Sequence, residues 1–275
     1  MSDVDLRGRV TLITGAARGV GREVALGLAE AGADIALIDR CRPLDSTPYA
    51  MASSGDLEAV RREIEDMGRR CVAFESDVSD LNAMTSTVEA AVAALGSVDI
   101  AVANAGIFTW GRLWELTERQ WDETIDINLK GTWITLKATV PHLIERGWGR
   151  VICISSTAGL RGSTNIAHYV ASKHGVVGLV RSLAMELGAY GITANAVCPS
   201  RMKTPMVTHQ EYYEAFAGPG ATEEQLDRVS RSEQVLPVDA VPVSAVRDAV
   251  IWLASDGARY VTGTALPIDA GEMLV

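Results

Sequence analysis

The sequence has few cysteines and no long apolar run. Its four cysteines (Cys41, Cys71, Cys153 and Cys198) show no CxxC or Cys/His spacing, which argues against a metal site and against a disulfide framework. Nowhere do 18 apolar residues follow one another, so no membrane partner is expected. The segment Met1–Arg9 also lacks the apolar core of a secretory signal. These absences predict a cytoplasmic protein with reduced, mostly buried thiols.

Basic residues are also scarce relative to acidic ones. Lys and Arg number 25 against 35 Asp and Glu, which gives a formal net charge of −10. Proteins that bind nucleic acid need clustered Lys and Arg against the phosphates, so we expect no nucleic-acid partner. The chain is 48% hydrophobic and 22% charged, which is typical of a globular protein, and we expect one domain over residues 1–275.

Short apolar runs alternate with longer segments of helical spacing. The predicted strands are Val10–Thr14, Asp34–Ile38, Cys71–Glu75, Ile100–Ala103, Arg150–Ile154, Thr193–Val197 and Ala265–Ile268. The predicted helical segments are Gly21–Ala31, Asp56–Met67, Leu81–Leu95, Glu118–Glu145, Val170–Leu187 and Ser244–Ala254. Such alternation implies βαβ units, so we predict an α/β fold with a doubly wound parallel sheet of about seven strands and helices on both faces.

Two segments interrupt this alternation. Residues 40–55 (RCRPLDSTPYAMASSG) are rich in Pro, Ser and Gly and lie where a connection is normally only a few residues long, which indicates an inserted loop. Residues 207–243 are polar, with possible short helices at His209–Ala217 and Thr222–Arg231. Long excursions of this kind are often lids or binding loops, and a disordered surface segment is the alternative.

A glycine-rich turn follows the first predicted strand. The run Thr14–Gly21 (TGAARGVG) continues directly into a predicted helix. Glycines allow a tight turn and let the N–H groups of a helix N-terminus approach a pyrophosphate. A glycine cluster alone is weak evidence, but between a strand and a helix of an alternating chain it favours a dinucleotide site. The candidate cofactor-binding residues here are Gly15, Arg18, Gly19, Val20 and Gly21.

An acidic residue, Asp39, closes the second predicted strand. Its carboxylate can accept hydrogen bonds from both hydroxyls of an adenine ribose, which favours NAD, and it would repel a 2′-phosphate. Arg18, Arg40 and Arg42 are the counter-signal, because guanidinium groups pair well with phosphate. Solvated surface charge is the other interpretation of these arginines. We therefore predict NAD as the cofactor, with NADP as the alternative.

The most informative constellation is a serine, a tyrosine and a lysine. Ser156 ends a predicted strand and is followed by Tyr169 and Lys173, which are four residues apart on a predicted helix. At this spacing the ammonium can lie close to the phenol. Bringing a phenol from a pKa of about 10 to near 7 requires roughly 4 kcal/mol, and Lys173 and an oxidised nicotinamide ring are both plausible sources. Ser156 would hydrogen-bond the substrate oxygen as charge develops on it.

With these motifs in place, the chain resembles the short-chain dehydrogenase/reductase family over essentially its whole length. The glycine-rich run is similar to the family's phosphate loop, and Ser156, Tyr169 and Lys173 stand at its catalytic positions. The resemblance implies a Rossmann-like fold in which Tyr169 and Lys173 also contact the cofactor. Further residues with roles implied in this way are Asp77 and Val78 at the adenine, Asn104, Ala105 and Gly106 in an NNAG-like run, and Asn128 as a fourth catalytic residue that holds a water.

The segment Pro199–Met206 resembles the family's PGxxxTPM motif. The resemblance implies that Pro199, Met202 and Thr204 bind the cofactor, the last two at the nicotinamide carboxamide. Ser200 stands where the family usually has glycine, and this departure leaves the carboxamide-binding positions in place.

The insert at residues 40–55 resembles that of a narrower, mycofactocin-associated subgroup, whose members are carveol dehydrogenase-like. In that subgroup the insert helps to bury an NAD that an external redox carrier regenerates in place. The family also implies a homo-oligomer, a dimer or a tetramer, that pairs through helices corresponding to Gly131–Glu145 and Val170–Leu187.

The substrate pocket is predicted to be mostly apolar. Aromatic residues make up only 5% of the chain, so two of them just after the NNAG-like run are candidate substrate contacts, with core packing as the alternative. The residues expected near the substrate are Ser156, Phe108, Trp110, Leu160, Arg161, Ile166, Met206 and parts of Met206–Phe216.

We therefore predict an oxidoreductase that transfers a hydride between NAD(H) and a secondary alcohol or ketone, with a hydrophobic cyclic or terpenoid-like small molecule as substrate. One alternative is an NADP-dependent ketoreductase of a polar or carrier-bound substrate. The other is a nicotinamide-binding regulatory protein without turnover. The complete set of Asn128, Ser156, Tyr169 and Lys173 argues against that, because a pure binder has no need of a tuned phenol.

Overall fold

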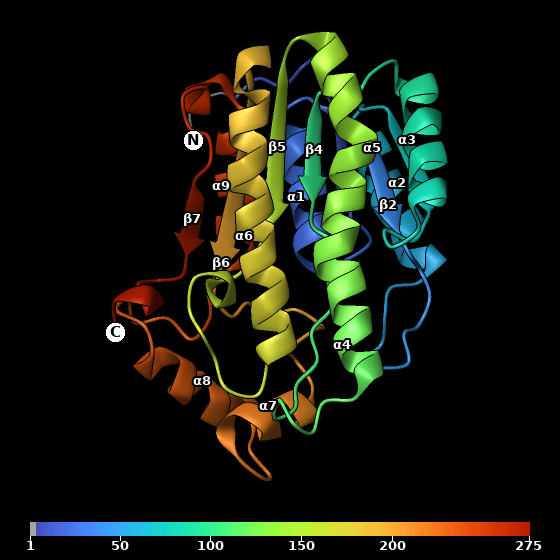
Figure 1. Cartoon of the computed structure of the whole chain (residues 1–275). Coiled ribbons are helices and arrows are strands. Elements are labelled where there is room, and N and C mark those ends of the chain that lie inside the picture. Colours follow the sequence, from blue (N-terminus) through green and yellow to red (C-terminus); the bar gives the residue numbers. More distant parts are fainter. Residues whose placement is uncertain (1–3) are drawn as a thin grey trace.

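The computed structural model describes residues 4–275, and residues 1–3 of the segment Met1–Arg9 lie outside the described part. Within residues 4–275, seven strands form one parallel sheet in the order β3-β2-β1-β4-β5-β6-β7 (Figure 1). The strands are β1 (Val10–Thr14), β2 (Asp34–Asp39), β3 (Cys71–Glu75), β4 (Ile100–Ala103), β5 (Gly149–Ile154), β6 (Ile192–Pro199) and β7 (Ala265–Ile268). The predicted α/β fold with a doubly wound parallel sheet is therefore confirmed.

The order of the strands reverses at β1. This strand pairs with β2 on one side, where Val10 is opposite Asp34, and with β4 on the other, where Thr11 is opposite Ile100. All five residues of β1 are buried, because helices cover both faces of the sheet. In open parallel sheets, ligands bind at the carboxyl ends of the strands beside such a reversal. The glycine-rich turn follows β1 directly and so lies at this point.

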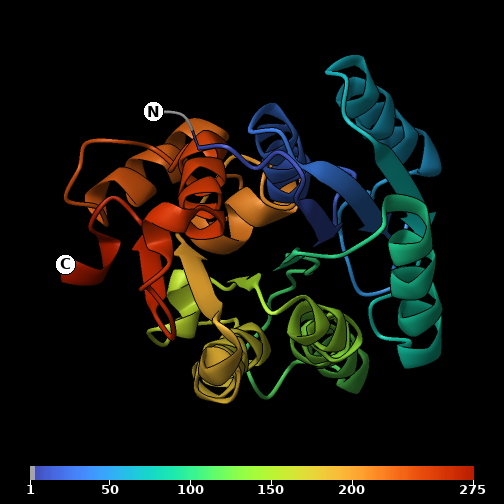
Figure 2. The same cartoon turned by 90° about the horizontal axis from the view of Figure 1, so that it is seen from above.

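Helices cover the two faces of the sheet in two layers (Figure 2). The helices α1 (Gly19–Glu30), α2 (Ser54–Asp66) and α9 (Val243–Ala254) contribute to one hydrophobic core. The helices α3 (Leu81–Leu95), α5 (Gly131–Arg146) and α6 (Ala167–Leu187) contribute to the other. Short 3-10 turns lie at Thr157–Gly159, Gly188–Tyr190, Asp256–Ala258 and Glu272–Leu274.

The segment Glu118–Glu145, predicted as one helical stretch, is divided in the structure. It consists of α4 (Glu118–Ile125), a π-helical turn at Asp126–Lys130, and α5. A π-helical turn inserts an extra residue into the helical ladder and is found frequently at functional sites. Here it carries the predicted catalytic residue Asn128.

The two predicted excursions both lie at the carboxyl end of the sheet (Figure 1). Residues 40–53 form an irregular connection between β2 and α2, as predicted. However, α2 begins at Ser54, two residues before the predicted start at Asp56, because Ser53 and Asp56 form a capping box. The segment 207–243 contains α7 (Gln210–Ala217) and α8 (Glu223–Ser232), which confirms its two short helices. Within the described residues, no helix has both the length and the apolar character needed to span a bilayer.

Candidate active site

A cavity of about 470 Å³ lies at the carboxyl end of the sheet. Its walls come from the glycine-rich turn, the ends of β4, β5 and β6, the start of α6, and α7 and α8. Most of the residues predicted to bind cofactor or substrate line it. The exceptions are Gly21, Trp110 and Leu160, and the predicted catalytic residue Asn128 does not line the cavity either. The fold therefore brings most of the residues that the sequence singled out to one cavity.

The glycine-rich turn is shaped by close backbone approach. Gly15 has a φ of +65°, and a Cβ placed on it would lie 2.8 Å from the Cα of Ala105. A Cβ on Gly21 would lie 2.0 Å from the Gly15 carbonyl oxygen, so Gly21 is required for packing although it does not line the cavity. The side-chain amide of Asn104 donates to the Thr14 and Gly15 carbonyls at 2.9 and 3.0 Å, which ties the end of β4 to the turn.

The start of α1 fits a phosphate group. The helix begins at Gly19, and no side chain caps it. The first N–H groups of a helix have no partner within the helix, and they carry a partial positive charge. Because Gly15, Gly19 and Val20 line the cavity beside this end, the residues present fit the pyrophosphate of a dinucleotide.

Asp39 is held in place at the end of β2. Its carboxylate accepts hydrogen bonds from the backbone N–H groups of Ala17 at 3.1 Å and of Cys41 at 3.2 Å. It lines the cavity and therefore fits the role of a ribose-binding carboxylate.

The three arginines that kept NADP as an alternative cofactor all have partners within the protein. Arg40 and Arg42 form ion pairs with Asp77 at 3.2 and 3.5 Å. Arg18 donates to the carbonyl of Ala50 in the insert. Their charges are thus engaged at a carboxylate and at the backbone, which weakens the case for a 2′-phosphate site.

The serine, tyrosine and lysine meet as the spacing predicted. Ser156 follows β5, and its Oγ accepts a hydrogen bond from the Ala158 N–H at 3.1 Å. Tyr169 and Lys173 lie one turn apart on α6, with the Lys173 Nζ 5.6 Å from the centre of the Tyr169 ring. The same Nζ donates to the Ile154 carbonyl at 2.9 Å. The ammonium is therefore fixed between the end of β5 and the phenol.

The protonation equilibria of this pair follow from burial. Burial raises the pKa of Tyr169 to about 12, although a hydrogen bond with Ser156 acts in the opposite direction. Burial also lowers the pKa of Lys173 to about 8. In the protein alone, loss of hydration is thus the largest cause of both shifts. The prediction that Lys173 and an oxidised nicotinamide ring bring the phenol towards neutrality concerns the cofactor-bound protein, and it stays a prediction.

Asn128 acts on the backbone rather than at the cavity wall. Its side chain is fully buried, accepts from the Ile107 N–H at 2.8 Å and donates to the Ile107 carbonyl at 2.9 Å. A Cβ on Gly106 would lie 3.3 Å from the Asn128 Oδ1 and 3.6 Å from the Lys173 Nζ. Asn128 therefore fixes the chain after β4 close to the lysine.

The substrate end of the cavity has an aromatic wall. Phe108 packs edge-on against Tyr169, with ring centres 4.8 Å apart. Trp110 lies behind Phe108 and contacts both Phe108 and His209. Contrary to the prediction, it does not line the cavity. Leu160 packs against the sheet core instead. Arg161, Ile166 and Met206 do line the cavity, as expected.

Sequence reasoning missed Tyr49, the only aromatic residue in the insert. Its side chain is buried, its hydroxyl accepts from the Phe108 N–H at 2.9 Å, and its ring lies 5.6 Å from that of His209. The insert thereby contacts both the aromatic wall and the segment before α7. Its isolation among Pro, Ser and Gly residues was the only available signal.

Comparison with known proteins gives consistent matches. The family model described as short chain dehydrogenase matches residues 9–214. The (-)-trans-carveol dehydrogenase of Rhodococcus erythropolis is 41% identical over 274 residues, which cover 98% of this chain and 99% of the relative.

Two solved structures superpose closely. The carveol dehydrogenase of Mycobacterium avium in complex with NAD is 40% identical with a TM-score of 0.96, and the match covers 98% of this chain and 99% of that one. A short chain dehydrogenase of Mycobacterium paratuberculosis bound to NAD is 39% identical with a TM-score of 0.90, and the match covers 98% and 100%.

Proposed function

The chain belongs to the short chain dehydrogenase family, and on this premise we propose that it is an NAD-dependent oxidoreductase acting on a secondary alcohol or ketone. The observation that carries the proposal is the convergence of Ser156, Tyr169 and Lys173 in the cavity that the glycine-rich turn also lines. Relatives that superpose closely are bound to NAD, which supports NAD as the cofactor.

In this reaction Tyr169 is the acid and base. Its phenolate accepts the hydroxyl proton of the alcohol, and its phenol returns a proton to the ketone oxygen in reverse. The Ala158 N–H holds the Ser156 Oγ in place beside Tyr169, and the Ser156 hydroxyl donates its hydrogen to the substrate oxygen when substrate binds. When bound, the oxidised nicotinamide supplies the hydride acceptor and a second positive charge near the phenol. Lys173 is the cation that the chain itself holds beside Tyr169.

The substrate is a hydrophobic cyclic or terpenoid-like alcohol. Phe108, Ile166, Met206, Tyr212 and Phe216 line the cavity and favour an apolar molecule. One relative is named for an alcohol, (-)-trans-carveol, which supports the same class. The segment 207–243, with α7 and α8, is the substrate lid of a single catalytic domain.

The decisive test is replacement of the phenol. Tyr169→Phe removes the proton-transferring oxygen and retains the ring that packs on Phe108. We expect turnover to fall by about a hundredfold or more, with NADH affinity nearly unchanged. Oxidation of cyclic secondary alcohols measures the first; it is run with NAD and NADP side by side and with an artificial electron acceptor that reoxidises any retained nicotinamide. Fluorescence titration of NADH into protein freed of nucleotide measures the second.

The matched control is Tyr190→Phe, because Tyr190 is an exposed tyrosine outside the cavity. Near-normal turnover in Tyr169→Phe would refute the assignment of the base. Faster turnover with NADP than with NAD would refute the choice of cofactor.

The insert buries the bound NAD, which an external redox carrier of the mycofactocin-associated type regenerates in place. The Tyr49 hydroxyl accepts a hydrogen bond from the Phe108 N–H, and this contact supports a role of the insert as a cover over the cavity. The assay is direct: protein purified without added cofactor is heat-denatured, and the supernatant is analysed for nicotinamide nucleotide. Much less than one equivalent per chain would exclude a resident NAD.

A further inference from the structure

The cavity is also lined by three polar residues that the proposed chemistry does not use. They are Ser200 and Arg201, just after β6, and Gln234, just after α8. Among residues 4–275, the Ser200 Oγ, the Arg201 Nε and Nη2 and the Gln234 Oε1 are buried and have no hydrogen-bond partner. Buried polar atoms without partners are rare in proteins and costly, so several on residues that line one cavity call for an explanation.

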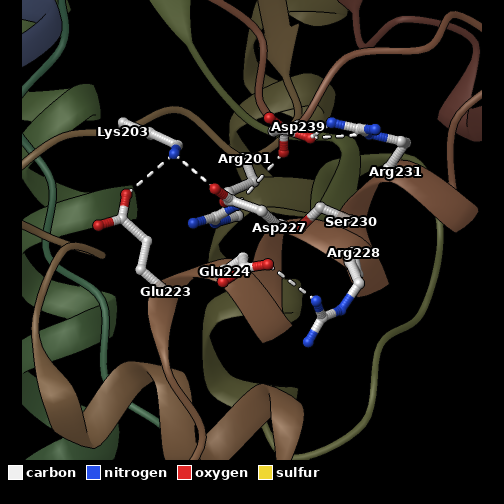
Figure 3. Close-up of polar contacts among 9 residues, drawn as sticks. All are labelled: Arg201, Lys203, Glu223, Glu224, Asp227, Arg228, Ser230, Arg231 and Asp239. Atoms are coloured by element: carbon white, nitrogen blue, oxygen red, sulfur yellow. Dashed lines mark hydrogen bonds and ion pairs between the residues drawn. The ribbon is translucent and has the colours of Figure 1, made fainter.

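The partners of Arg201 lie on one edge of its guanidinium. The Nη1 donates to the Asp227 carboxylate at 2.8 Å, to the Ser230 Oγ at 3.3 Å and to the Asp239 carbonyl at 3.2 Å. Figure 3 shows the residues of this cluster and the connections among them. The side chain is only 9% exposed, so solvent does not satisfy the opposite edge.

The unpartnered Nε and Nη2 form the second edge of the same rigid plane. Two parallel N–H groups in this arrangement fit an acceptor oxygen or a pair of oxygens. Asp227 holds Nη1 on the other side, and the guanidinium is therefore fixed in orientation before any ligand arrives. This is the geometry of a recognition group.

The surrounding charges select a neutral ligand group. Asp227 pairs with both Arg201 and Lys203, and Lys203 also pairs with Glu223 at 2.9 Å, so two cations face two anions (Figure 3). A bound carboxylate would add an uncompensated charge to this buried site. Arg161, another cation on the cavity wall, pairs with Glu272. A carbonyl or hydroxyl oxygen completes the hydrogen bonds without adding charge.

We propose that Arg201 is a specificity-determining residue, and that the substrate is an apolar ring compound with a second, neutral oxygen distant from the reacting carbon. This inference rests on the proposed function and narrows its substrate class from hydrophobic alcohols to oxygenated ones. Ser200 and Gln234 line the same cavity, and each also holds a buried polar atom without a partner among the described residues.

The test uses three cyclohexanols that differ in one group of equal size: isopropyl, acetyl or carboxylate. The group is placed opposite the hydroxyl or one carbon nearer. In the wild-type protein with NAD, we expect kcat/KM for the better acetyl isomer to exceed that of the matching isopropyl compound by about tenfold or more, because hydrogen bonds from charged groups contribute that much. The carboxylate compound should be the poorest.

Three variants assign any preference to Arg201. Arg201→Met removes both N–H groups, and Arg201→Lys keeps the charge beside Asp227 but lacks the planar fork. Both should reduce the acetyl preference to below about threefold, mainly through KM. Arg228→Met is the control, since Arg228 lies on α8 next to Asp227, pairs with Glu224 and does not line the cavity. Circular dichroism checks that each variant is folded. If the Met variant is unfolded, the Lys variant alone provides the test.

Binding is measured apart from turnover, so that the two proposals can fail separately. The matching cyclohexanones are titrated calorimetrically into NADH-loaded Tyr169→Phe protein. Tighter binding of the acetyl ketone without wild-type turnover would refute the proposed function and support Arg201 recognition. Turnover or binding that is equal for acetyl and isopropyl compounds, a preference that survives in Arg201→Lys, or a preference for the carboxylate would overturn the inference.

Discussion

Lys173 is a buried ammonium that the fold holds at a cost in stability. Its only hydrogen bond among the described residues is to the Ile154 carbonyl, and burial lowers its pKa from 10.5 to about 8. The folded protein therefore binds fewer protons at this group than the unfolded chain does between pH 8 and pH 10.5. By linkage, the free energy of unfolding rises with pH across that window, and the destabilisation is fully present below pH 8.

The prediction is that Lys173→Met removes this pH dependence. A shift of this size corresponds to about 3 kcal/mol, part of which is offset because the Ile154 carbonyl loses its donor. At pH 7 the Met variant should be as stable as the wild type or up to about 2 kcal/mol more stable, while its activity is lost. Between pH 7 and pH 10 the wild type should gain about 2–3 kcal/mol relative to the variant. Urea unfolding at both pH values, without cofactor, measures this.

Lys137→Met is the control, because Lys137 is exposed on α5. It should leave the pH dependence unchanged. A Met variant at position 173 that runs parallel to the wild type from pH 7 to pH 10 would show that the ammonium is not desolvated in the folded protein.

The spacing of residues along the chain predicts only part of the site. The interval between Tyr169 and Lys173 fixes them on one helix face, so their proximity could be foreseen. Their pKa values could not, because desolvation depends on which other segments cover them. The roles of Arg201 and Gln234 were equally invisible, since a buried edge without a partner exists only in three dimensions.

The insert and the π-helical turn were only partly predictable from the sequence. The Pro, Ser and Gly content of residues 40–55 indicated a loop, because these residues disfavour regular structure. The contact of Tyr49 with Phe108 joins segments far apart in sequence and left no periodic signal. The π-helical turn at Asp126–Lys130 has side chains compatible with an α-helix, so the pattern predicted one uninterrupted helical segment.

Removing one oxygen tests whether the insert is held down by Tyr49. Tyr49→Phe leaves the ring against His209 but removes the acceptor of the Phe108 N–H, a buried donor. An unpartnered buried N–H costs about 1–3 kcal/mol, and opening the insert relieves that cost. We expect dissociation of NADH to accelerate by roughly tenfold in a stopped-flow displacement experiment, with kcat changed much less. An unchanged dissociation rate would mean that the insert stays closed without this bond.

At the scale of the whole molecule, the apolar surface of the outer helices carries information. Trp133 on α5 is 42% exposed and Met185 on α6 is 87% exposed. These two helices correspond to the segments through which the family resemblance implies pairing. Exposed large apolar side chains on adjacent long helices are typical of an interface between copies of a chain. We therefore propose that two copies of the chain form a dimer through α5 and α6. A tetramer would be an association of two such dimers.

Analytical ultracentrifugation of Met185→Glu tests this assembly. A symmetric two-helix interface places each copy of residue 185 against its partner's surface, so two carboxylates would be buried without counter-charges, which strongly disfavours association. We expect the wild type to sediment as a dimer or tetramer and the Glu variant to sediment as a smaller species. Trp114→Glu is the matched control, because Trp114 is 78% exposed but lies outside both helices. If both variants keep the wild-type mass, the chain associates through another face or not at all, and the exposed side chains of α5 and α6 need a different explanation.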